Sequence, residues 1–155
     1  MPQDPTAPPP HHVLDHGLAM GLGVPQFTAR RFTAHPNSLR TLKPFIRRTL
    51  RSWDALACLT DTLTVAGELA ANAAHHALDA PANRTHAWLA LARTAYFVLC
   101  TVTDPSRRLP TPAPPTEHPT DHRCGLRTVH QLSEDWGYTL LTDTTGKTVW
   151  ARLRH

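Results

Sequence analysis

Apolar positions in the first half of this 155-residue chain recur at spacings of three and four residues, the period of a helix packed on one side. One apolar stripe consists of Leu39, Leu42, Ile46, Leu50 and Trp53. It predicts a helix after Pro36, with Asn37 or Ser38 as its cap. Pro44 lies inside this helix and predicts a kink or a broken first turn. A second helix, rich in Ala and Leu, is predicted from about Asp54 to Leu78.

Other segments alternate with a period of two, which indicates strands. These segments are residues 26–33, 87–91, 96–102, 138–142 and 147–153, the last two as a closing hairpin. A short helix is predicted from about Gly125 to Asp135, stopped by Trp136-Gly137. This order of elements predicts an α+β fold, a two-layer sandwich with helices on one face of a mixed, mostly antiparallel sheet.

Proline marks two segments that do not fit either period. Of the 15 prolines, six lie in residues 1–25 and six in residues 105–119. Residues 1–25 carry few large apolar side chains, so we predict a disordered tail. Residues 105–119 are predicted to form a long irregular loop, of the kind that is often functional. Residues 26–155 then make up one domain.

Composition and cysteine content indicate the class of protein and the compartment in which it is found. Hydrophobic residues make up 41% and charged residues 18% of the chain, which is typical of a globular domain. The three cysteines form no C-x-x-C pair or disulfide framework, which indicates a reducing compartment. No segment reaches the roughly 20 apolar residues of a membrane span, so we expect a soluble, cytoplasmic protein without a membrane partner. The 11 histidines show no zinc-ligand spacing.

The net charge of +4 is concentrated near the first helix. Four residues form a basic stripe along that helix, namely Arg40, Lys43, Arg47 and Arg51. The stripe is either a solvated helix face or a docking surface for an acidic partner. No recognised nucleic-acid-binding motif accompanies it, so we do not favour a nucleic-acid partner.

A line of polar side chains crosses the small apolar surface of the second helix. Glu68, Asn72 and His76 are spaced by four residues and therefore share one side of the helix. An Asn oxygen suits a hard cation such as Mg²⁺ that is completed by substrate phosphates, and a Glu one turn away can act as a general base. The alternative is that both side chains line a solvated helix face.

Four segments carry a more specific signal. They are residues 68–77 (ELAANAAHHA), 102–106 (VTDPS), 125–137 (GLRTVHQLSEDWG) and 146–151 (GKTVWA). In this order they resemble the N box, the adenine-binding Asp motif, the helix after the nucleotide lid and the closing hairpin of the GHKL (Bergerat-fold, histidine-kinase-like) ATPases. The form of the N box is that of the anti-sigma-factor serine/threonine kinases. The resemblance covers nearly all of residues 26–155.

The resemblance implies a role for each matching residue. Asn72 would coordinate a Mg²⁺ ion that bridges the ATP phosphates, and Glu68 would be the catalytic base. Asp104 would accept a hydrogen bond from the adenine amino group, with Thr148 assisting through water. Gly125 and Leu126 open a helix whose free N–H groups suit a phosphate.

The chain departs from the family pattern in its nucleotide lid, expected at residues 105–122. The glycines that many relatives carry after the adenine Asp are absent, since Pro105 to Arg108 follow Asp104. Arg123 stands where relatives have a glycine, and it would either narrow the phosphate site or contact phosphate together with Arg107 and Arg108.

The resemblance therefore implies two functions. In the first, the protein binds MgATP and phosphorylates a Ser or Thr of an antagonist protein or sequesters a sigma factor, and it forms a homodimer. In the second, it is a degenerate, non-catalytic GHKL interaction module with weak or no ATP binding.

Overall fold

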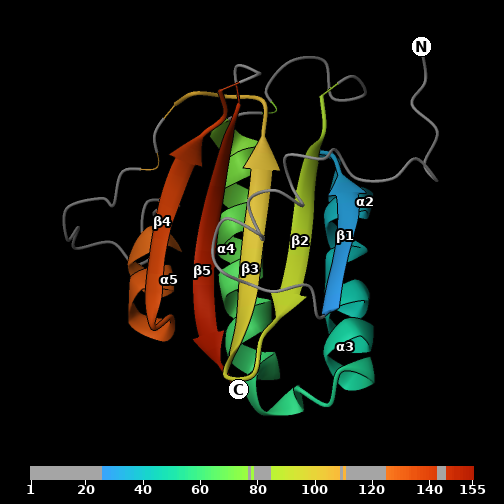
Figure 1. Ribbon diagram of the computed structural model, residues 1–155. Helices are drawn as coiled ribbons and strands as arrows, with labels where there is room; N and C mark the ends of the chain where they lie inside the picture. Colours follow the sequence, from blue (N-terminus) through green and yellow to red (C-terminus); the bar gives the residue numbers. More distant parts are fainter. Residues whose placement is uncertain (1–25, 77, 79–84, 109, 111–124, 143–145) are drawn as a thin grey trace, which may run out of the picture.

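The computed structural model describes residues 26–76, 78, 85–108, 110, 125–142 and 146–155. Within these residues one sheet of five strands is backed by helices (Figure 1). The strands are β1 (Gln26–Phe32), β2 (Ala87–Arg93), β3 (Phe97–Asp104), β4 (Asp135–Leu140) and β5 (Lys147–Arg154). The helices are α2 (Pro36–Arg40), α3 (Leu42–Ser52), the short 3₁₀ helix η1 (Leu56–Cys58), α4 (Leu59–His76) and α5 (Gly125–Leu132).

The sheet has the order β1-β2-β3-β5-β4, and each neighbouring pair of these strands is antiparallel. All the described helices lie behind one face of it, with α4 behind the central strands, α5 behind β4 and α3 behind β1 (Figure 1). The predicted α+β sandwich is therefore confirmed. Insertion of β5 between β3 and β4 places the ends of β3 and β5 side by side.

The core lies between the helices and the sheet. It is filled by the apolar residues that recur every three or four positions in the helices and every two positions in the strands. Leu89 of β2 and Val98 and Cys100 of β3 point inward with no exposed surface. The apolar stripe after Pro36 also packs inward, with Ile46 and Leu50 almost completely buried. Burial raises the pKa of Cys100 to about 12, so this thiol is an apolar core side chain.

The first helix differs from the prediction in its cap, and the second in where it begins. The cap is His35, whose Nδ1 accepts the N–H of Asn37 at 3.1 Å, rather than Asn37 or Ser38. The predicted break is found at Thr41, which separates α2 from α3, because Pro44 has no N–H to donate to the preceding turn. Asp54 adopts a positive φ of 52° and ends α3, so the next helix cannot begin there and α4 starts at Leu59.

The last helix is shorter than predicted. It ends at Leu132, and Trp136 and Gly137 belong to β4 instead of stopping the helix. Pairing with β5 decides this boundary, since Trp136 lies opposite Ala151 and Gly137 opposite Trp150. A Cβ on Gly137 would lie 2.8 Å from the Trp150 ring, so glycine here accommodates a neighbouring strand and not a helix end.

Several predicted features lie outside the described residues. They are the tail of residues 1–25, most of the lid, and Arg123. None of the helices in the described part of the chain has the length and hydropathy needed to cross a membrane.

Candidate functional site

The first part of the candidate site is a pair of polar side chains on α4, Glu68 and Asn72, which we call the α4 pair. Both are partly exposed, while Leu69, Ala70 and Ala73 on the neighbouring face are buried. Helical spacing therefore places the α4 pair at the border between core and solvent. Among the described residues we find no hydrogen bond or ion pair of either side chain. Their carboxylate and amide oxygens are therefore free to bind a ligand, as far as the described residues go.

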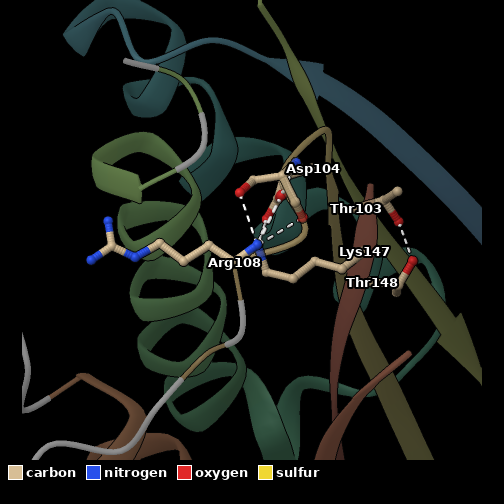
Figure 2. A network of polar contacts seen from close by, with 6 residues as sticks. Thr103, Asp104, Arg108, Lys147 and Thr148 are labelled. Carbon is tan, nitrogen blue, oxygen red and sulfur yellow. Dashed lines mark hydrogen bonds and ion pairs between the residues drawn. The ribbon is translucent and has the colours of Figure 1, made fainter. Parts of the chain in front are cut away.

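The second part is a buried ion pair at the adjoining ends of β3 and β5. Asp104 is the last residue of β3 and lies opposite Lys147, the first residue of β5. Lys147 Nζ lies 2.9 Å from both Asp104 carboxylate oxygens, and the side chains are 5% and 3% exposed, respectively. Figure 2 shows the lysine side chain pointing directly at the carboxylate.

The buried ion pair satisfies its own hydrogen-bonding groups. Lys147 Nζ also donates to the carbonyl oxygen of Ser106 at 3.3 Å, so all three ammonium protons have an acceptor. Asp104 Oδ1 additionally accepts the backbone N–H of Ser106 at 2.8 Å. Burial raises the pKa of the Asp104 carboxyl, and the hydrogen bond and charge of Lys147 oppose that rise.

Close backbone contact between the two strand ends holds the ion pair in place. A Cβ at Gly146 would lie only 2.4 Å from the carbonyl oxygen of Asp104. The N–H of Leu141 donates to the carbonyl of Gly146 at 3.0 Å and closes the hairpin of β4 and β5. Because only glycine allows this approach, Gly146 fixes where Lys147 enters the sheet.

Thr148 does not join this site. Its hydroxyl is fully buried and lies 2.8 Å from that of Thr103, its partner across the strands. Successive side chains of a strand point to opposite faces, so Thr148 faces away from Asp104 and Lys147, as Figure 2 shows. The residue of the closing hairpin that meets Asp104 is Lys147.

The phosphate-binding candidates are only partly described. Gly125 is the first residue of α5, and α5 packs against α4. Leu126 is buried in the core, which leaves its backbone rather than its side chain to meet a ligand. Arg107 and Arg108 follow the ion pair and are exposed, and Arg107 Nη1 lies 3.5 Å from the carbonyl of Leu141.

The two parts differ in how well they fit MgATP. The oxygen donors of the α4 pair suit Mg²⁺ that keeps water and phosphate ligands. The described residues hold no cluster of three or more His, Cys, Asp or Glu side chains, so a metal there needs such outside ligands. The fit fails at Asp104, because the carboxylate that the resemblance assigns to an adenine amino group already contacts the ammonium group of Lys147.

Sequence reasoning overlooked Lys147, although a signal for it exists. The alternation of the last strand places Lys147 on the same face as Val149, Ala151 and Leu153, all of which are buried. A lysine at the inward end of an apolar strand needs a buried anionic partner, and such a partner can be sought among the other strand ends.

Comparison with known proteins supports the fold. The chain matches no protein-family profile and no curated protein. It is similar to a solved structure described as the crystal structure of the RsbU and RsbW domains of Rv1364c from Mycobacterium tuberculosis, with a TM-score of 0.62 and 17% identity. The match covers 84% of this chain and 32% of that chain, about a third of its length. The likeness to a structure containing an RsbW domain agrees with the fold expected from the motifs.

Proposed function

We propose that this chain is an ATP-binding regulatory protein of the anti-sigma-factor serine/threonine kinase type. The α4 pair is the observation that carries the proposal. Glu68 and Asn72 stand one helical turn apart, partly exposed, with no described partner for either polar group. A structural role does not require two such groups beside a face of small buried residues.

Each residue of the α4 pair has a distinct task in the proposal. The amide oxygen of Asn72 holds a Mg²⁺ ion that also binds the nucleotide phosphates, and Glu68 orients or deprotonates the acceptor hydroxyl. When bound, ATP supplies the phosphoryl group. Phosphoryl transfer depends mainly on positioning and charge neutralisation, so it needs no further catalytic side chain.

The proposed partner is a sigma factor or an antagonist protein that carries the accepting Ser or Thr. The basic stripe supports a protein partner with acidic surface, since Arg40, Lys43, Arg47 and Arg51 are all exposed on α2 and α3. Residues 26–53 of the described chain contain no Asp or Glu. The stripe therefore carries uncompensated positive charge that can steer an acidic partner.

Calorimetric titration with ATP in the presence and absence of Mg²⁺ tests the proposal. We expect wild type to bind MgATP, and Asn72→Ala to weaken this binding by about tenfold or more while binding without Mg²⁺ changes less. Asn37→Ala is the matched control, because Asn37 is an exposed asparagine on α2. If wild type does not bind MgATP at millimolar concentration, the proposal is wrong.

A second function, a non-catalytic interaction module, is favoured by one observation, the buried ion pair. Its ammonium group takes the carboxylate that the family uses for adenine. Under this function the protein captures its partner equally well with and without MgATP, and Glu68→Gln has no effect on capture. Partner binding that rises with MgATP and a phosphorylated partner would exclude it.

A further inference from the structure

The buried ion pair bears directly on base recognition, and this inference rests on the proposed function. Among the described residues, the Asp104 carboxylate is paired with the side chain of Lys147. Lys147 contacts both carboxylate oxygens at 2.9 Å, the contacts drawn as dashed lines in Figure 2. The contact joins residues 43 positions apart in the sequence, so it is a feature of the tertiary fold.

The hydrogen-bonding capacity of the ion pair leaves little for a base. Asp104 Oδ1 accepts from Lys147 and from the N–H of Ser106, and Oδ2 accepts from Lys147. The positive charge of Lys147 also cancels the negative charge that would favour an amino donor. One acceptor site remains on Oδ2, but the carboxylate is only 3% exposed, so an adenine amino group could reach it only by moving an ammonium group that makes three contacts of its own.

Displacement of Lys147 is costly because of where the lysine lies. Its side chain is 5% exposed, and its backbone is fixed by pairing with β3 and by the contact of Gly146 with Asp104. An ammonium group removed from the carboxylate would need another anion or access to water. Pairing of Lys147 with Asp104 and Leu140, and of Thr148 with Thr103, prevents the backbone from carrying the lysine away.

We infer that Lys147 is a specificity-determining residue that occupies the base-recognising carboxylate, so that the protein binds purine nucleoside triphosphates without reading the purine 6-substituent. Affinity then comes from the phosphates and the metal at the α4 pair. The class of ligand is a magnesium complex of a purine nucleoside triphosphate, with no preference for adenine.

The alternative is that Lys147 itself recognises the base by a hydrogen bond. A lysine that donated to the 6-oxo group of guanine would favour GTP. The three acceptors already held by Nζ argue against it, since the ammonium group has only three protons.

The test compares three ligands by calorimetry, each with Mg²⁺: ATP, GTP and purine riboside 5′-triphosphate, which lacks the 6-amino group. We expect full-length wild type to bind all three within about threefold of one another. Lys147→Met, which keeps the length of the side chain and removes the charge, should favour ATP over the purine analogue by about tenfold, the effect of one hydrogen bond to a charged acceptor. Arg154→Met is the control, because it removes one cation from the same strand at a side chain that is 70% exposed.

Each outcome decides between the alternatives. If wild type already favours ATP over the purine analogue by tenfold, Asp104 reads the base with Lys147 in place, and the inference is wrong while the proposed function stands. A wild-type preference for GTP, or a Lys147→Met variant that folds without gaining a preference for ATP, also overturns it. If neither protein binds any triphosphate, the proposed function fails and the inference fails with it. Should circular dichroism show that Lys147→Met does not fold, Lys147→Gln, which keeps one N–H donor for Asp104, replaces it with an expected gain of about threefold.

Discussion

The α4 pair and the buried ion pair are two halves of one candidate site, and they differ in almost every physical respect. Glu68 and Asn72 are partly exposed and have no described partner, whereas Asp104 and Lys147 are buried and hydrogen bonded to each other and to Ser106. The first half has polar groups without a partner among the described residues. The second half has already satisfied its polar groups internally.

This difference separates function from stability within one site. A buried charged residue without its partner costs several kcal/mol, so the strand ends depend on their ion pair for folding. A partly exposed polar pair on a helix contributes little to stability and is free to serve binding. Substitutions at the buried ion pair should therefore change stability most, and substitutions at the α4 pair should change ligand binding most.

Loss of Lys147 should have the largest effect on stability. Lys147→Met leaves the Asp104 carboxylate buried without its counter-ion, and we expect the free energy of unfolding to fall by roughly 3–5 kcal/mol. Urea denaturation measures it. Arg154→Met, whose ion pair with Glu134 is exposed, should stay within about 0.5 kcal/mol of wild type. Equal losses of unfolding free energy in the two variants would mean that the buried ion pair stabilises the fold no more than the exposed one.

Substitution of Gly146 should be next. Gly146→Ala places a methyl group 2.4 Å from the Asp104 carbonyl oxygen, and neither group can move freely because Asp104 is paired with Lys147, the residue next to Gly146. We expect a loss of roughly 1–3 kcal/mol from overpacking, measured by thermal or chemical unfolding. A variant as stable as wild type would show that the ends of β3 and β5 are less closely joined.

The pH dependence of stability should report Asp104. The folded pKa of this carboxyl is raised above its ordinary value by burial, with Lys147 opposing the rise. A raised folded pKa means that the contribution to stability is full below the unfolded pKa and is lost as the pH rises through the folded pKa. In Lys147→Met the opposing charge is gone, so the pKa should rise further and the loss should extend to higher pH, by about 1.4 kcal/mol for each added unit. Tm measured between about pH 3 and pH 7 for both proteins checks this, and parallel curves would contradict it.

Substitution of Gly67 should change the free energy of unfolding in the opposite direction to substitution of Gly146. It lies exposed within α4, next to Glu68, and no atom lies within 4 Å of a Cβ built there. Gly67→Ala should therefore raise the free energy of unfolding by roughly 0.5–1 kcal/mol, since alanine has the higher helix propensity. Chemical denaturation measures the gain. A destabilised variant would indicate a contact with the helix that the described residues do not supply.

The smallest effect on stability is expected at the α4 pair itself. Glu68→Gln and Asn72→Ala should change the free energy of unfolding by less than about 0.5 kcal/mol, because neither side chain has a described partner. Both are expected to weaken phosphoryl transfer or MgATP binding under the proposed function. Denaturation and calorimetry on the same samples test the two statements together. A large stability loss at Asn72 would assign it a structural role.

Local periodicity was sufficient to predict most elements. The stripe from Leu39 to Trp53, the Ala-rich α4 and the alternating strands are all found, because each period reflects burial of one face of a single element. The ends of the elements were harder to predict. Asp54 ends α3 with a positive φ, and Gly137 lies in a strand beneath the Trp150 ring. Both depend on neighbours or backbone conformations that composition does not reveal.

The residues of the candidate site also differ in how far the sequence could predict their neighbours. Sequence alone determined that Glu68 and Asn72 share one side of a helix, because residues four apart are neighbours on any α-helix. Only the tertiary structure decided what meets Asp104. Strand order brings the end of β5 beside the end of β3, and antiparallel register sets Lys147, not Thr148, on the face of the carboxylate. Helical neighbours follow from covalent spacing, whereas cross-strand neighbours follow from a register that the whole sheet fixes.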